Sequence, residues 1–298
     1  MTGEKFKIWA GFAAISIIWG STWLAIKIGV AETPPFLASG LRFLIASCIL
    51  YAIIRARGLK IVLTPDAKKL YTAMGILSFF IPFALVYWAE QYIPSSLSSI
   101  LFAAFPFWVA IFVHFFLRTE TIDIFKAAGI ALGFLGVLLI FWGDFNINNV
   151  LAALGMGALV VSTMMQAYAL TIVKRLGQPI SPFVMNFVGM SMATVALLIL
   201  SALTEPWGGI HWTATAVGSI LYLACFGSVV TFVTYYWLLK RIQAVYLSLT
   251  SFINPIVAVF LGALVLGEAL EPMVFVGAAL VLAGILLANG KALLARVG

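Results

Sequence analysis

The amino-acid sequence predicts an all-α polytopic membrane protein whose ten transmembrane helices form two inverted repeats of five. Three observations carry this prediction: an extreme apolar content, basic residues confined to alternate connections, and a second half that repeats the first. Of the 298 residues, 64% are hydrophobic and only 9% are charged, against roughly 25% charged residues in soluble domains. A soluble core of this length would leave too much apolar surface in water, whereas about 20 apolar residues cross a bilayer as one helix.

The ten predicted spans are apolar runs bounded by charge, proline or glycine. They fall at 8–28, 35–54, 70–90, 95–117, 124–142, 150–174, 182–203, 214–239, 244–266 and 272–290. Connections are short, so residues 1–298 are expected to form a single transmembrane domain without a separate soluble catalytic part. The first run follows Lys5 and Lys7, as in a signal peptide, but it has no small-residue cleavage motif. It is therefore expected to remain as the first helix.

The basic residues predict how the helices are oriented. With ten spans, both termini and the even-to-odd connections share one side, and 15 of the 17 Lys and Arg residues fall there. Because basic residues concentrate in cytoplasmic loops, both termini are expected in the cytoplasm. The same bias accounts for the net charge of +7. The expected partner is therefore the lipid bilayer, and no nucleic-acid partner is needed to explain the charge. Cys48 and Cys225 lie inside apolar runs, which argues against a disulfide or a zinc site.

The second half of the chain repeats the first at an offset near 149 residues. The repeat aligns residue types that rarely match by chance: Trp88 with Trp237, Pro106 with Pro255 and, after a one-residue deletion, Glu120 with Glu268. The predicted repeats are residues 1–147 and residues 148–298, each with five helices. Because five is odd, the second repeat enters the membrane from the opposite side. Such inverted repeats place a binding site near the midplane and permit alternating access.

Ionisable groups inside a membrane are the default functional candidates because burying them is costly. No Asp or Glu lies at the centre of a predicted span, which argues against a dedicated proton-antiport carboxylate. Glu90, at the end of the third span, is expected to be a solvated helix-end charge. Arg42 could meet an anionic substrate group, but snorkelling or pairing with Glu32 is the favoured interpretation. Because His114 and His211 are distant and lack acidic partners, we expect no metal, cofactor, catalytic residue or enzyme activity.

The spans instead carry aromatic rings and small hydrogen-bonding groups. We expect the following residues to line a substrate cavity: Trp19, Trp23, Phe83, Tyr87, Trp88, Ser99, Gln166, Tyr168, Tyr235, Tyr236, Trp237, Thr250 and Asn254. The alternative is that Trp and Tyr form an interfacial belt and that Ser and Thr hold helices together. A neutral aromatic cavity suits an amphipathic, partly aromatic or weakly charged solute. It suits strongly anionic cargo poorly.

Proline and glycine mark two further features of the helices. Pro106 and Pro255 lie mid-span at matching positions, where each removes a backbone hydrogen bond and kinks its helix. They are candidate hinges or gates, with a purely structural kink as the alternative. The fifth and tenth spans carry glycines that favour close helix packing over substrate contact: Gly129, Gly133, Gly136, Gly277 and Gly284.

These patterns resemble the drug/metabolite transporter superfamily, of the ten-helix EamA type, over nearly the whole chain. The resemblance rests on Trp19-Gly20-Ser21 in the first span, and on Phe105-Pro106 and Asn254-Pro255, each followed by a Glu before a glycine-rich helix. Within the superfamily, the aromatic-rich chain resembles bacterial exporters of aromatic amino acids. This implies export of amino acids and related metabolites across the bacterial inner membrane by alternating access, with spans three, four, eight and nine around the cavity.

Other functions stay open at this stage. The chain could export other neutral or cationic metabolites or drugs, or it could be a sugar-phosphate-type exchanger, which needs Lys or Arg in its cavity. A different class of function is a passive channel or a membrane assembly factor. An inverted repeat with matched prolines favours transport of a small-molecule substrate, and nothing in the sequence indicates an oligomeric state.

Overall fold

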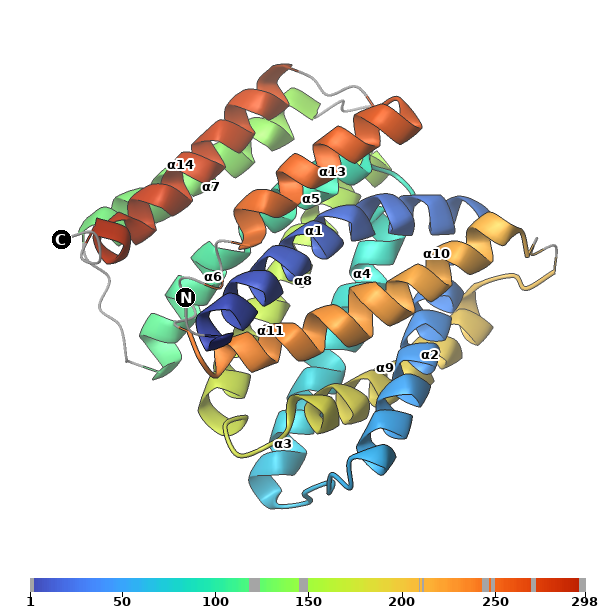
Figure 1. The fold of residues 1–298 in the computed structure, drawn as a ribbon. Coiled ribbons are helices and arrows are strands. Elements are labelled where there is room, and N and C mark those ends of the chain that lie inside the picture. The colour runs from blue at the N-terminus through green and yellow to red at the C-terminus, as the bar shows by residue number, and fades with distance from the viewer. Residues whose placement is uncertain are drawn as a thin grey trace.

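The structure is a computed structural model that describes residues 3–117, 124–144, 150–208, 210, 212–242, 247, 250–268 and 272–294. Within these ranges every regular element is a helix (Figure 1). Seven of the described helical segments are long and apolar enough to cross a membrane: Phe6–Glu32, Pro35–Ala56, Pro65–Ala89, Ser95–Leu117, Val150–Leu176, Pro182–Thr204 and Ala214–Leu239. The prediction of an all-helical polytopic membrane protein is confirmed.

The described part of the first half contains five helical stretches, two of which are interrupted. In order they are α1 (Gly3–Glu32), α2 (Pro35–Ala56), α3 (Pro65–Ala73) with the π-helix η1 (Met74–Phe80) and α4 (Ile81–Ala89), α5 (Ser95–Phe102) with α6 (Phe105–Phe112) and the π-helix η2 (Val113–Leu117), and α7 (Ile124–Asp144). The described stretches of the second half are α8 (Val150–Leu176), α9 (Pro182–Thr204), α10 (Ala214–Ala224) with the π-helix η3 (Cys225–Val230) and α11 (Thr231–Leu239), α13 (Thr250–Leu266) and α14 (Pro272–Leu294).

Helices α7, α13 and α14 lie where the sequence predicts three further spans. The connections before α7 and α14, and most of the segment before α13, lie outside the described residues, as does Glu120. The count of ten spans, the inverted relation of the halves and the cytoplasmic termini therefore stay predictions.

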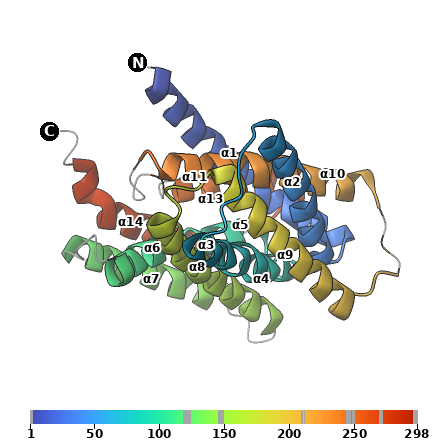
Figure 2. The same cartoon turned by 90° about the horizontal axis from the view of Figure 1, so that it is seen from below.

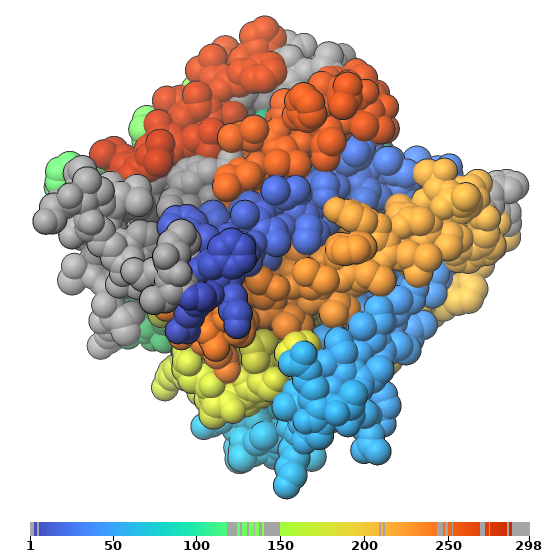
Figure 3. Space-filling model, viewed as in Figure 1, coloured from blue at the N-terminus to red at the C-terminus, as the bar shows by residue number. Residues whose placement is uncertain are grey.

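The helices lie in two layers with α1 running through one of them. Helices α1, α10, α11 and α13 form one layer, and α4, α6, α7 and α8 form the other, as the two views show (Figures 1 and 2). On the face in Figure 3, α1 lies between α13 and the α10–α11 pair. Gly20 permits this contact, because a Cβ there would lie 2.6 Å from Val257 Cβ and 3.1 Å from the Asn254 carbonyl oxygen.

Glycines also let α7 and α14 pack closely at one edge of the molecule (Figure 1). A Cβ on Gly136 would lie 2.5 Å from the Gly277 carbonyl oxygen, and a Cβ on Gly284 would lie 2.5 Å from the Gly129 carbonyl oxygen. Only glycine leaves the two backbones this close. The prediction that these glycines serve packing rather than substrate contact is confirmed for the described part of the two helices.

Carboxylates from the second half of the chain cap the N-termini of two helices in the first half. The Glu205 carboxylate accepts hydrogen bonds from the backbone N–H groups of Phe36 and Leu37, at the start of α2. The Glu268 carboxylate accepts from the backbone N–H and hydroxyl groups of Ser95 and Ser96, at the start of α5. Such carboxylates satisfy unpaired helix N–H groups and complement the helix dipole. They also join the two halves at one end of the bundle.

The two prolines that the sequence pairs are not equivalent in the structure. Pro255 lies inside α13, as predicted for a mid-helix proline. Pro106 instead lies in the first turn of α6, because the span breaks at Ala103 and Ala104 between α5 and α6. A proline in the first turn of a helix removes no intrahelical hydrogen bond. Pro106 still lies in the middle of the span Ser95–Leu117, and the helix is interrupted directly before it, so its role as a hinge or gate stays a prediction.

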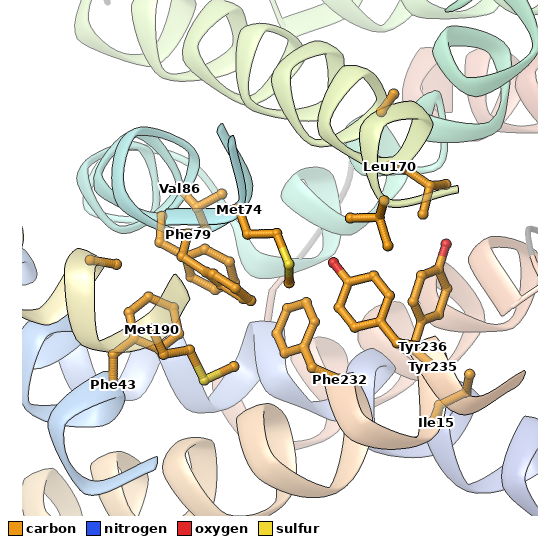
Figure 4. Packing of buried hydrophobic residues seen from close by; sticks show 14 of the residues in the cluster. Ile15, Phe43, Met74, Phe79, Val86, Leu170, Met190, Phe232, Tyr235 and Tyr236 are labelled. Carbon is orange, nitrogen blue, oxygen red and sulfur yellow. The ribbon is translucent and has the colours of Figure 1, made fainter. Parts of the chain in front are cut away.

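Two π-helical segments lie at nearly matching positions of the two halves. Helix η1 covers residues 74–80, and η3 covers residues 225–230, close to the positions 223–229 that the 149-residue offset gives for η1. Aromatic rings pack around Phe79 of η1: its centroid lies 5.1 Å from that of Phe232 in α11 and 5.5 Å from that of Phe43 in α2 (Figure 4). Because π-helical turns often occur at functional sites, the region around η1 and η3 is a candidate functional site.

Candidate functional site

A cavity lies between the two layers, beside the π-helical segments. It encloses about 90 Å³, room for about six to nine water molecules at roughly 10–15 Å³ each. Its walls come from α1, α2, η1, α4, α5, α6, α8, α11 and α13. Eight of the residues expected to face a substrate line it, namely Trp19, Trp23, Phe83, Gln166, Tyr235, Tyr236, Thr250 and Asn254.

Aromatic rings make up much of the cavity wall. The ring of Trp19 packs edge-on against Phe232 at 5.4 Å and lies 5.1 Å from Tyr235, between ring centroids. Trp23 lies 5.3 Å from Phe102 across the same space. In Figure 4 the hydroxyl ends of Tyr235 and Tyr236 point toward the side of the cavity that carries Leu170. This wall offers ring faces together with a few polar tips.

Asn254 and Thr250 bring hydrogen-bonding groups from α13 to the cavity. With its amide oriented to satisfy both ends, the Asn254 side-chain nitrogen donates to the backbone oxygens of Ser16 at 2.9 Å and Thr250 at 3.0 Å. The Gln166 side-chain nitrogen donates to the Ser162 hydroxyl at 3.2 Å. These contacts hold the two amides in place beside the aromatic wall.

Five residues expected in the cavity lie elsewhere. Tyr87 is buried just behind the wall, with its hydroxyl oxygen 3.4 Å from Arg42 Nη1. Trp88 packs against Tyr92, Ser99 donates to the Ser96 backbone oxygen, Tyr168 packs against Phe112 and Phe116, and Trp237 lies under the Arg241 guanidinium. Helical spacing placed these residues on helices that line the cavity or lie beside it, but not on the faces that line it: Trp88, Ser99 and Trp237 contact residues close to them in the chain, and Tyr168 packs against α6 and η2.

Arg42 lines the cavity and is only 2% exposed. The favoured expectation, that it snorkels or pairs with Glu32, is wrong. Its side chain points inward to Ser228 and Gly227, and Glu32 instead accepts a hydrogen bond from Thr213. The sequence signal that could have found this site is the Gly227-Ser228 pair within an otherwise bulky span, but its partner is 185 residues away in the chain.

Glu90 is also not the solvated helix-end charge that the sequence suggests. It is 0% exposed, and both carboxyl oxygens lack a hydrogen-bond partner among the described residues. The Lys27 ammonium group lies nearby and donates to the backbone oxygens of Glu90 and Ile93, at 2.6 and 2.8 Å. Helix α5 and its preceding turn close over this end of α4, which the apolar pattern alone cannot show.

No group of three or more His, Cys, Asp or Glu side chains that could hold a metal ion occurs in the part of the chain the structure describes. The site is therefore defined by ring faces, neutral hydrogen-bonding groups and one buried cation. An inner cavity of this kind, enclosed by apolar helices, is typical of helical membrane transporters.

Comparison with known proteins identifies the family. The model of the EamA-like transporter family matches residues 7–142 and 153–290, most of the chain. The chain belongs to this family, and it is a multi-pass membrane transporter of the drug/metabolite transporter type.

The relatives extend over nearly the full length of the chain. It is 30% identical over 279 residues to the uncharacterized transporter YoaV of Bacillus subtilis, covering 94% of this chain and 95% of that protein. It is 28% identical over 293 residues to the uncharacterized inner membrane transporter YedA of Escherichia coli K12, covering 97% and 92%. A solved crystal structure matches with a TM-score of 0.71 at 20% identity, over 97% of this chain and 98% of that one, which shows a shared fold.

Proposed function

We propose that this protein exports amino acids, aromatic ones and related metabolites first among them, from the bacterial cytoplasm across the inner membrane. The observation that carries the proposal is the cavity in which Trp19, Tyr235 and Tyr236 present ring surface beside the amides of Gln166 and Asn254. Aromatic and amide groups together suit a solute with a ring at one end and polar groups at the other. The likeness to a relative named an inner membrane transporter supports the location.

Alternating access is the mechanism we propose for this cavity. At about 90 Å³ it is small for an aromatic amino acid, so the surrounding helices must move apart to admit one. The break at Ala103 and Ala104 and the proline in α13 give two places where helices beside the cavity can bend. Two family-model matches, at residues 7–142 and 153–290, support the proposal that residues 1–147 and 148–298 are inverted repeats.

The basic residues support the proposed orientation. Arg241 forms an ion pair with Glu4 at 3.9 Å, and the Lys240 ammonium group donates to the backbone oxygens of Gln178 and Ile180. These contacts gather the start of α1, the α8–α9 connection and the end of α11 at one end of the bundle. We assign this basic end, and both termini, to the cytoplasm.

A sugar-phosphate-type exchanger fits less well. Arg42 is the one basic residue among the described residues that line the cavity, whereas a phosphate dianion calls for several cationic groups. A passive channel fits poorly too, because aromatic side chains packed at 5.1 to 5.4 Å fill the space that an open pore would need.

Flux through proteoliposomes tests the proposal. We expect uptake of radiolabelled phenylalanine, tyrosine and tryptophan to saturate and to be stimulated by unlabelled amino acid inside. Trp19→Ala should reduce this flux about tenfold, because it removes a ring from the cavity wall. Trp9→Ala is the matched control, since Trp9 is 65% exposed and away from the cavity. Unstimulated, non-saturable flux, or equal flux in the two variants, would contradict the proposal.

A further inference from the structure

Arg42 is a buried cation whose described hydrogen-bond partners are all neutral. Its guanidinium group makes three described hydrogen bonds, all to neutral oxygens: Nε to Ser228 Oγ at 2.8 Å, Nη2 to the Gly227 carbonyl oxygen at 2.9 Å, and Nη1 to the Tyr87 hydroxyl oxygen at 3.4 Å. No carboxylate of a described residue forms an ion pair with it. A charge buried in this way is expensive unless it is compensated.

No described carboxylate is paired with Arg42; three are engaged elsewhere, and the Glu90 carboxyl oxygens have no hydrogen-bond partner among the described residues. Glu32 accepts from Thr213, Glu205 caps α2, and Glu268 caps α5. Glu90 lies at the end of α4, where Lys27 binds its backbone oxygen. Arg42 therefore lines the cavity without an ion pair to any described carboxylate.

The hydrogen bonds of Arg42 leave some N–H donors of its planar guanidinium group, here called the fork, free. A guanidinium group has five N–H donors, and the three described bonds use three of them. One N–H on each terminal nitrogen remains, which matches the two oxygens of a carboxylate. The faces of the group lie near aromatic rings, with the Arg42 carbon Cζ 4.9 Å from the Phe83 ring centroid and 5.5 Å from that of Phe43.

The π-helix η3 holds the fork in place. The Gly227 carbonyl oxygen, within η3, accepts from both Arg42 and the Thr231 hydroxyl group. The Ser228 hydroxyl group, which accepts from Arg42, donates in turn to the Leu223 carbonyl oxygen at 3.0 Å. Neutral acceptors fixed in this way orient Arg42 without neutralising it, which preserves its attraction for an incoming anion.

We propose that Arg42 is the receptor for the carboxylate of the transported solute. This inference rests on the proposed function and narrows its substrate class to carboxylate-bearing amphipathic molecules, with the ring against the aromatic wall and the carboxylate on the free N–H groups. One planar fork in a small cavity matches a monoanionic carboxylate better than a phosphate dianion. Amines and amides that lack the carboxylate leave Arg42 uncompensated and bind weakly.

Paired ligands and matched variants test this site. Phenylacetate and its neutral isostere phenylacetamide are titrated into purified full-length protein while the intrinsic tryptophan fluorescence is followed, to which Trp19 and Trp23 of the cavity wall contribute. The wild-type protein should bind phenylacetate at least about tenfold more tightly than phenylacetamide. Arg42→Gln should abolish this preference, and Arg42→Lys, which keeps the charge but loses the fork, should retain a smaller one. Arg57→Gln is the control, because Arg57 lies over the Phe183 ring outside the cavity.

Each outcome bears on one claim. Equal binding of the two ligands by the wild-type protein would overturn the carboxylate site, whether or not Arg42→Gln folds. A preference that survives in folded Arg42→Gln would also overturn it. A phenylacetate preference that depends on Arg42, in a protein that fails to move amino acids in proteoliposomes, would uphold the site and refute the proposed export of amino acids.

Discussion

Replacing Gly284 by alanine should weaken the α7–α14 contact by a predictable amount. The new Cβ would lie 2.5 Å from the Gly129 carbonyl oxygen and 2.6 Å from the Gly133 nitrogen, and both are backbone atoms that cannot rotate away. An ordinary contact begins near 3.4 Å, so the helices must separate by 3.4 − 2.5, or about 0.9 Å. Overpacking of this kind costs about 1–3 kcal/mol, and the better helix propensity of alanine returns about 0.5–1 kcal/mol.

The central values of these ranges, about 2 and about 0.75 kcal/mol, leave a net loss of about 1 kcal/mol, measured as a lower apparent Tm of the purified protein in detergent. Gly157→Ala is the matched control, because Gly157 also lies inside a helix but a Cβ there has nothing within 4 Å. That variant should be as stable as the wild-type protein or slightly more so. If Gly284→Ala proves as stable as Gly157→Ala, the close backbone contact is not what holds α14 to α7. Ligand binding by the folded fraction should be unchanged, since neither glycine lines the cavity.

Two further predictions concern the helix start at α5 and the position of Arg42. Burial acts to raise the pKa of the Glu268 carboxyl group, but hydrogen bonds from Ser96 and Ser95 outweigh it and hold that pKa below its ordinary value of 4.5. The ionised group thus stabilises the fold above pH 4.5, and this stability is lost as the pH falls through the lower folded pKa. Glu268→Gln should lower Tm at pH 7 by the equivalent of about 1 kcal/mol and flatten the acid side of the Tm–pH curve; an unchanged curve would refute the cap. Gly227→Ala should weaken phenylacetate binding about tenfold, because its Cβ would lie 2.8 Å from Thr22 Cγ2 and 3.3 Å from Arg42 Nη2. Wild-type affinity in that variant would show that η3 does not position Arg42.

The class of fold could be predicted from the sequence because the thickness of the bilayer sets the length of each apolar span, whatever the rest of the chain does. Each span needs about 20 apolar residues, and seven described helices satisfy that requirement where the apolar runs predict them. The packing of α7 on α14 was equally accessible, since glycine at helical spacing is a local signal of close approach.

The surroundings of Arg42 and Glu90 were not accessible in this way. Whether a charge in a span snorkels, pairs or points inward depends on which distant helices lie beside it. Arg42 is held by Gly227 and Ser228, more than 180 residues further along the chain. The π-helices η1 and η3 could not be predicted from the local sequence either. Their segments, MGILSFF and CFGSVV, differ in sequence, and no residue in either one marks the change in hydrogen-bond register.

The break before Pro106 shows why matched residues need not have matched geometry. The repeat pairs Pro106 with Pro255, yet one lies in the first turn of α6 and the other inside α13. The alternating-access mechanism that we propose requires the two halves to differ in conformation in any one state. A broken helix on one side of the cavity and a continuous one on the other is the asymmetry expected of a single state in that cycle.

An experimental structure with bound phenylalanine tests the central claim most directly. We expect the amino acid in the cavity, with its carboxylate oxygens within hydrogen-bond distance of the terminal nitrogens of Arg42. Its ring should lie against the wall formed by Trp19, Phe232 and Tyr235. Phenylalanine bound outside this cavity, or bound within it with the carboxylate turned away from Arg42, would contradict the account.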